Sequence, residues 1–202
     1  RRTQFYGQFL LDEFILSKIK SEPGNWTNKF AIQLGAKYID AFGIRHLDLQ
    51  AEANRVRPFT YSHSDSVSNY THYNQPLAHP LGANFQEFIV IANYQPYPRL
   101  NINTKLIHYY KGLDSTGTNF GGNIFKSYNS RIGDDGFMLA GGNKVTCTNI
   151  SFNLSYEMKQ NLFFDFGIIN RNFHNTKANN TASNTIYQAA MRLNIGRREY
   201  DF

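Results

Sequence analysis

The chain has 202 residues and a formal net charge of +6, and 41% of its residues are hydrophobic, 15% aromatic and 18% charged. This length suffices for one sizeable domain. The many Phe and Tyr residues argue against a disordered chain. No apolar run exceeds about five residues, whereas a spanning helix needs about 18 or more, which excludes a helical membrane protein. Cys147 is the only cysteine, which excludes a disulfide framework.

Alternation of apolar and polar residues is the dominant pattern along the chain, and its period of two predicts β-strands. In residues 148–158, Ile150 and Phe152 alternate with Ser151 and Asn153. The strands predicted in chain order are 2–14, 29–42, 46–53, 87–95, 99–111, 148–158, 162–173 and 187–196. We therefore expect an all-β, antiparallel fold and a single domain over residues 1–202.

The polar faces of the predicted strands carry amide and charged side chains, which are too polar for the core of a sandwich. These side chains are Gln4, Gln8, Gln33, Lys37, Asn101, Asn103, Lys105, Asp165 and Arg171. In a transmembrane barrel the apolar face meets lipid and the polar face lines the interior. The pattern fits either a barrel wall or a one-sided soluble sheet.

The connections between the predicted strands alternate in length. Long connections are expected near 15–28, 58–86, 112–143 and 175–184, with short turns between them. Outer-membrane barrels join their strands in this way, with short periplasmic turns and long external loops. This alternation favours an outer-membrane β-barrel in contact with lipid, with its long loops on the cell exterior.

Aromatic residues near the strand ends agree with that interpretation. Membrane barrels carry aromatic girdles at both interfaces, and here the candidates are Phe30, Tyr38, Tyr94, Tyr110, Tyr156 and Tyr200. The chain ends on Phe202 after an alternating strand, a pattern typical of outer-membrane proteins, so we expect the true C-terminus to be present. The first strand begins abruptly at Arg1, and the interior residues are mostly mid-sized. A wall of about eight C-terminal strands in a larger barrel is therefore favoured over a closed eight-stranded one.

Charges of both signs are expected in the same interior. His46, Asp48 and Glu52 share a predicted strand, while Lys37 and Arg192 lie on others. Because opposite charges can pair, a plugged or narrow barrel of low conductance is favoured over an open, ion-selective pore. No run of Lys and Arg residues is longer than two, so no nucleic-acid partner is expected.

Two segments carry a resemblance to a known family. One runs from Glu52 to Asp65 (EANRVRPFTYSHSD) and continues from Asn69 to Phe88 (NYTHYNQPLAHPLGANFQEF). The other is Tyr6 to Phe14 (YGQFLLDEF). Both resemble the Wzi-like capsule-assembly family, especially its RemB-like members from gliding Bacteroidetes. The resemblance implies an outer-membrane barrel of about 18 antiparallel strands, within the range of such barrels.

The same resemblance implies a non-enzymatic role at the cell surface. That role is attachment of capsular polysaccharide, or adhesion and gliding motility for the gliding-associated relatives. It implies no cofactor, and it carries over no catalytic or sugar-contacting residue to this sequence.

The long loop near 58–86 is the chemically densest part of the chain. Sugar binding requires aromatic faces and hydrogen-bonding amides or carboxylates. The carbohydrate-binding candidates are Tyr61, His63, Asp65, Tyr70, His72, Tyr73, Asn74, Gln75, His79 and Asn84. The alternative is a structural strap held by its own hydrogen bonds, with Pro58, Pro76 and Pro80 fixing its path.

Other chemistries have weaker support. The three loop histidines match no compact metal motif, so no metal is expected. The pairs Asp12–Glu13 and Asp134–Asp135 are adjacent in sequence and are not placed for acid and base catalysis. Three alternative functions stay open: a structural subunit of an outer-membrane complex such as a secretion or motility machine, a porin-like channel, and a barrel hydrolase. The first would take other membrane proteins as partners instead of polysaccharide.

Overall fold

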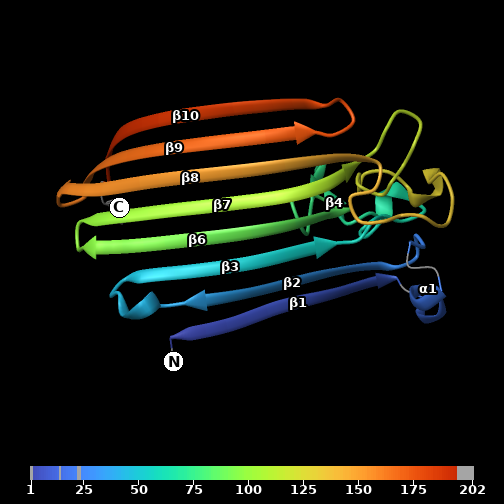
Figure 1. Cartoon of the computed structure of the whole chain (residues 1–202), viewed down its shortest axis with the longest axis horizontal. Helices are drawn as coiled ribbons and strands as arrows, with labels where there is room; N and C mark the ends of the chain where they lie inside the picture. Colours follow the sequence, from blue (N-terminus) through green and yellow to red (C-terminus); the bar gives the residue numbers. More distant parts are fainter. Residues whose placement is uncertain (1, 14, 22–23, 195–202) are drawn as a thin grey trace, which may run out of the picture.

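The computed structural model describes residues 2–13, 15–21 and 24–194, which form an extended antiparallel sheet with loops gathered at one end (Figure 1). The strands of this sheet are β1 (Thr3–Glu13), β2 (Lys29–Tyr38), β3 (Leu47–Val56), β6 (Phe85–Tyr97), β7 (Leu100–Leu113), β8 (Asn143–Lys159), β9 (Leu162–Asn175) and β10 (Asn180–Leu193). The short elements are α1 (Leu16–Ser21), the hairpin strands β4 (Thr71–His72) and β5 (Gln75–Pro76), and the 3-10 turns η1 (Ala41–Gly43), η2 (Ser66–Ser68) and η3 (Tyr128–Ser130).

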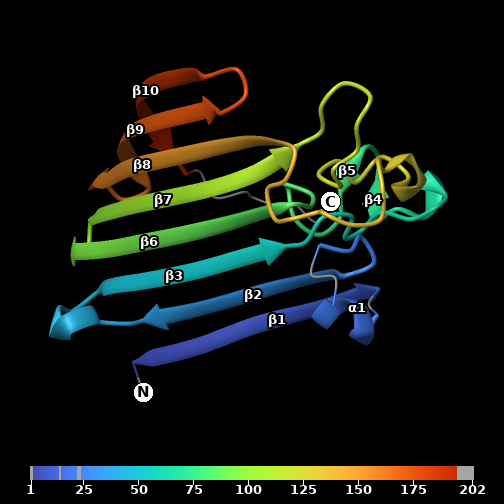
Figure 2. The same ribbon diagram turned by 45° about the vertical axis from the view of Figure 1, so that its right-hand side comes forward.

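The eight long strands pair in the order β1-β2-β3-β6-β7-β8-β9-β10, and each pair is antiparallel. They correspond one to one with the eight strands predicted from alternation, which confirms the all-β antiparallel fold. The sheet is not closed: within the described residues, β1 and β10 are its two edges and do not pair with each other. Figure 2 shows the same open arrangement.

The two faces of the sheet differ in chemistry. Strand register places a set of large apolar side chains on one face, hereafter the apolar face, where their exposed fractions run from 43% to 80%: Phe5, Phe9, Leu34, Phe88, Val90, Ile150, Phe164, Tyr187 and Met191. The opposite, polar face carries all nine amide and charged residues that alternation assigned to it, from Gln4 to Arg171. In the described part of the chain no segment covers the apolar face.

Five of the six expected girdle residues lie on the apolar face near strand ends. Phe30 and Tyr110 are near the end with the long loops, and Tyr38, Tyr94 and Tyr156 are near the end with the short turns. The sixth, Tyr200, lies outside the described residues, as does Phe202.

The most deeply buried side chains lie where the long loops meet the strands, not between two layers of sheet. One cluster joins Ala31, Val56 and Phe85 on the polar face to Tyr61, Ala83 and Ile124 from the loops. Phe59 packs edge-on against Phe137, with ring centroids 4.8 Å apart. We call this assembly of residues 24–28, 57–84 and 114–142 the loop cap. No helix among the described residues is long and apolar enough to cross a membrane.

The connections differ in detail from the expected ones. The connection expected over 175–184 covers only residues 176–179, because residues 180–186 extend β10 and pair with β9. The Oδ1 of Asn175 accepts a hydrogen bond from the Ala178 amide at 3.1 Å, which stabilises this tight turn. Part of the expected loop 15–28 is helix α1, whose last turn carries Lys18 and Lys20, a favourable placement at a helix C-terminus.

Candidate functional site

The loop at 57–84 folds back over the polar face and leaves a cleft of about 370 Å³ against strands β1 to β3. The cleft brings together aromatic rings, a histidine and three amides: Tyr61, Tyr70, His79, Gln8, Gln33 and Asn54. An aromatic wall facing several amides is the chemistry that sugar hydroxyls and the apolar faces of sugar rings require. Three of the ten predicted site residues therefore line one cleft.

Two tyrosines form the aromatic wall of this cleft. The rings of Tyr61 and Tyr70 are stacked, with centroids 5.9 Å apart, and the Tyr70 amide donates to the Tyr61 carbonyl at 3.0 Å. The Tyr61 amide in turn donates to the Asp12 carboxylate at 3.0 Å. Burial, followed by the nearby Asp12 charge, raises the pKa of the Tyr61 phenol. Tyr61 is thus a fixed, neutral part of the cap, whereas Tyr70 is half-exposed and free to contact a ligand.

His79 has a defined tautomer. Its Nδ1 accepts a hydrogen bond from the Leu81 amide at 3.2 Å, so the ring proton is on Nε2, which donates to Glu87 Oε2 at 3.0 Å. The Asn54 amide reaches the same Glu87 oxygen at 3.0 Å and Glu52 Oε1 at 2.9 Å. These bonds form an ordered polar floor beneath the cleft.

Six of the predicted residues lie elsewhere in the loop. The His63 amide donates to Asn69 Oδ1 at 2.6 Å, and Asp65 Oδ1 accepts from the Val67 amide at 3.0 Å, which caps η2. His72, Tyr73, Asn74 and Gln75 form the hairpin of β4 and β5. Tyr73 and Asn74 have positive φ angles of 47° and 58°, as a tight two-residue hairpin turn requires. Tyr73 is 88% exposed, so the hairpin presents an aromatic side chain outside the cleft.

Asn84 does not fit the prediction that it contacts a ligand, because its side chain is fully buried. Its Nδ2 donates to the carbonyls of Gly112, Phe120 and Gly141, and its Oδ1 accepts from the Ala140 amide at 2.7 Å. It therefore joins the loop at 57–84 to the segment at 114–142. The hydrogen bonds of this residue fit the structural-strap alternative.

A cationic and aromatic cluster fixes the other side of the loop cap. The fully buried Lys29 ammonium lies 2.8 Å from Glu13 Oε2, 3.1 Å from the Ser62 carbonyl and 4.2 Å from the centre of the Tyr128 ring. Tyr128 also packs on Trp26, with ring centroids 4.7 Å apart. Sequence patterns did not identify this cluster, because its members come from four separate segments.

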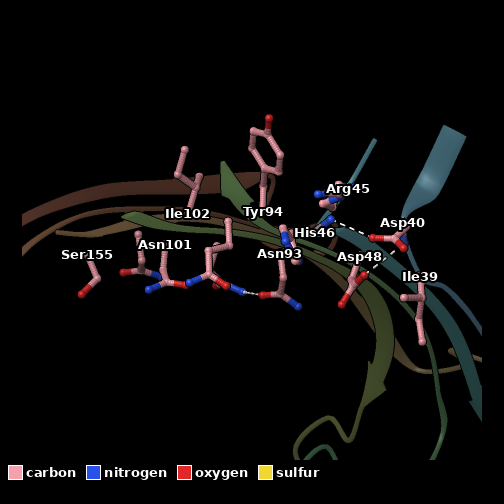
Figure 3. Close-up of a pocket in the computed structure, with 13 residues that line it drawn as sticks. Ile39, Asp40, Arg45, His46, Asp48, Asn93, Tyr94, Asn101, Ile102 and Ser155 are labelled. Carbon is pink, nitrogen blue, oxygen red and sulfur yellow. Dashed lines mark hydrogen bonds between the residues drawn. The ribbon is translucent and has the colours of Figure 1, made fainter. Parts of the chain in front are cut away.

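A second hollow, of about 780 Å³, lies on the polar face at the end with the short turns (Figure 3). Its lining includes Asp48, Asn93, Asn101, Asn103 and Asn153. In Figure 3, Asn93 and Asn101 point to one side of the sheet, whereas Tyr94 and Ile102 point to the other. Alternating asparagines on the strands predicted this polar face, but nothing in the sequence singled it out as a site.

Among residues 2–13, 15–21 and 24–194, no group of three His, Cys, Asp or Glu side chains is placed to hold a metal ion. Comparisons of the chain with protein-family models, with curated proteins and with solved structures found no match.

Proposed function

We propose that this chain forms part of the wall of a bacterial outer-membrane β-barrel of Wzi-like type, without enzymatic activity, that acts in surface polysaccharide attachment, adhesion or gliding. The observation that carries the proposal is the uncovered apolar face across all eight strands, opposite a polar face that carries charges of both signs. Lipid covers the first face in this proposal, and the second lines the barrel interior.

The size of the apolar face supports contact with lipid. Eight strands about 4.8 Å apart make a face about 35 Å wide, and about four apolar residues, spaced two apart along each strand, give it about 20 Å of height. The resulting area of about 700 Å² exceeds the roughly 300–600 Å² of the largest apolar patch on a typical soluble monomer. The strands are also long enough, since a transmembrane strand needs about 9–11 residues.

The borders of the apolar face agree with membrane interfaces. Towards the long loops the same face becomes polar, with the Tyr110 hydroxyl donating to Gln86 Oε1 at 2.7 Å and Asn170 Nδ2 donating to Thr185 Oγ1 at 2.8 Å. Tyr38, Tyr94 and Tyr156 border it at the other end, as aromatic girdles do. In this arrangement the loop cap faces the cell exterior.

The unpaired edges of the sheet support a larger barrel. Exposed strand edges bind further strands readily, and no described residue pairs with the outer edges of β1 and β10. We propose that these strands complete a barrel of about 18 strands, as the family resemblance implies. Oppositely charged side chains that pair on the polar face, such as Arg192 with Asp165 at 2.9 Å, favour a narrow, poorly conducting interior.

The cleft under the loop at 57–84 is the proposed polysaccharide site. Native mass spectrometry of the full-length protein, purified in mild detergent and analysed for both protein and sugar, tests this function. We expect stoichiometric polysaccharide that Tyr70→Ala reduces and that Tyr73→Ala, an exposed aromatic change outside the cleft, leaves in place. Complete absence of glycan from the washed wild-type protein would refute the polysaccharide role.

A second candidate is a structural subunit of an outer-membrane complex, and the two unpaired strand edges are the observation that favours it. In the same experiment, stoichiometric protein partners without glycan would support this candidate.

A further inference from the structure

A row of amide side chains crosses the polar face at the end with the short turns. Strand register aligns Asn93 of β6, Asn103 of β7, Asn153 of β8, Gly167 of β9 and Gln188 of β10. We call these five residues, four with amide side chains and one glycine, the amide row. At about 4.8 Å per strand, the row spans about 19 Å, the length of a short oligosaccharide chain rather than of a single sugar.

Hydrogen bonds between its members order the row. Asn103 Nδ2 donates to Asn93 Oδ1 at 2.6 Å, and Gln188 Nε2 donates to Asn153 Oδ1 at 3.3 Å. Gln188 reaches Asn153 across Gly167, where an added Cβ would lie 2.4 Å from Gln188 Nε2 and 2.9 Å from Asn153 Oδ1. A glycine at this position therefore allows the amide pair to form.

The row keeps unused hydrogen-bonding groups that face the hollow of Figure 3. Asn93 and Asn153 each use their side-chain oxygen in the two bonds above, which leaves their NH₂ groups as donors, and Asn103 keeps its oxygen as an acceptor. Donors and acceptors thus alternate along a surface that is fixed on strands. Hydroxyl groups, which both donate and accept, complement such a surface.

The charges next to the row balance. Asp48 lies beside Asn93 in register, and its Oδ1 accepts a bond from the Asp40 amide at 3.2 Å. Lys105 is two residues from Asn103 on the same face. At the other end of the row, Asp165 lies two residues from Gly167 on the same face and pairs with Arg192 at 2.9 Å, and Asp40 and Arg45 line the hollow. Anions and cations therefore border the row in equal number, so the described charges give no excess of cations that would select an acidic sugar.

We propose that the amide row is a binding track for a neutral, hydroxyl-rich saccharide chain, which lies across strands β6 to β10 on the inner face of the wall. This proposal rests on the surface-polysaccharide function and specifies the chemical class of the glycan and a second place where it is held, separate from the cleft in the loop cap.

The test uses the full-length protein in detergent, with two probes prepared from the surface polysaccharide of the cells that make it: a neutral fraction and an acidic fraction, separated by anion exchange. Dissociation constants are measured for the wild type, Asn103→Leu, Asn153→Leu, Asn149→Leu and the cleft variant Tyr70→Ala. Asn149 is the matched control, since it lies on the same face of the same strand, four residues from Asn153.

We expect the neutral fraction to bind, and each replacement within the row to weaken its binding about twofold to tenfold, the equivalent of one net hydrogen bond. Asn149→Leu should leave binding unchanged. Heat-modifiable migration on gels reports folding, and Asn153→Ser, which removes the amide with less added apolar surface, replaces Asn153→Leu if the latter folds poorly.

Four results would overturn the proposal. Equal effects of Asn153→Leu and Asn149→Leu would show that the row makes no specific contact. Binding of the acidic fraction alone would contradict the neutral class. Loss of neutral binding in Tyr70→Ala, with none in the row variants, would leave the polysaccharide function standing and remove the track. Failure of both fractions to bind the wild type would remove the proposal together with the polysaccharide function.

Discussion

The loop cap and the eight-stranded sheet of β1 to β3 and β6 to β10, here called the wall, are stabilised in different ways. Phe59 and Asn84 in the cap, and Lys29 of β2 beneath it, are fully buried, and their polar groups are satisfied by other loop segments or strand ends. In the wall, Phe5 and Tyr187 remain more than two-thirds exposed, although each lies on a regular edge strand that pairs along its length with one neighbour. The cap therefore carries its own core, whereas the wall has paired backbones and apolar side chains that no described segment covers. In the proposed function, lipid covers these side chains.

This difference can be tested most severely on the apolar face. Phe152→Arg places a charge at the centre of that face, where Arg costs about 2–4 kcal/mol in a membrane barrel. We expect the variant to lose most of its heat-resistant, membrane-assembled form. Ser151→Arg, on the adjacent residue and the opposite face, is the matched control and should assemble.

Assembly is measured by heat-modifiable migration and by extraction of membranes with urea. If the two arginine variants behave alike, the apolar face does not contact lipid. The sheet would then not differ from the cap in its need for an external apolar medium.

The cap should depend instead on its internal hydrogen bonds, and Asn84 is its most connected side chain. Asn84→Ala leaves the Ala140 amide and three carbonyls without this partner, and each buried group left unpaired costs about 1–3 kcal/mol. We expect faster hydrogen exchange in residues 114–142 and unchanged exchange in β6 to β9. Asn74→Ala is the control, because its φ of 58° matches the 59° of Asn84 while its side chain lies in an exposed turn.

Equal exchange in the two alanine variants would mean that backbone strain, and not the hydrogen bonds of Asn84, explains any change in the cap.

The contrast between wall and cap also separates what sequence could and could not predict. Alternation predicted every strand of the wall and the face of residues such as Gln33 and Asn103, because a strand's side-chain direction depends only on its own period of two. The prediction of a long connection at 175–184 was wrong. Asn, Thr and Ser are typical of loops, but here they continue strand β10, and their side chains form hydrogen bonds with β9, as Thr181 Oγ1 does with His174 Nδ1 at 2.9 Å.

The site was less predictable than the strands, for a physical reason. The role of Asn84 depends on Gly112 and Gly141, which lie 28 and 57 residues further along the chain. Composition identified a loop in which Tyr61, Tyr70 and His79 line one cleft, and their role in binding stays a prediction. It could not distinguish side chains that line the cleft from those that hold the cap together, since that depends on contacts between distant segments.

A smaller effect is expected at the ion pair between the fully buried Lys29 of β2 and the half-exposed Glu13 of β1. Glu13→Gln leaves the fully buried Lys29 ammonium without its anion, and a hydrogen bond to a charged group contributes about 1.5–3 kcal/mol. Lys29→Met removes the charge together with its need for a partner, so we expect it to destabilise the cap less than Glu13→Gln does. Limited proteolysis of residues 114–142 measures the difference, and a reversed order would show that the aromatic contacts of Lys29 outweigh its ion pair.

The smallest expected effect is the pH response of Tyr61, which distinguishes a buried cap from a solvated one. Burial and the Asp12 charge raise the pKa of this phenol in the folded protein, so the unfolded chain loses the proton first as pH rises. The stability that Tyr61 contributes is therefore complete below its ordinary pKa of 10 and is lost as the pH rises through the folded value. Difference spectra of phenolate absorbance between the wild type and Tyr61→Phe should contain one late-titrating tyrosine, with cap exchange accelerating over the same range. A difference spectrum that titrates at the ordinary pKa would mean that solvent reaches the Tyr61 ring. In that case the loop at 57–84 lies open over the sheet, and the cleft beneath it is accessible from the side of Tyr61 as well as from the side of Tyr70.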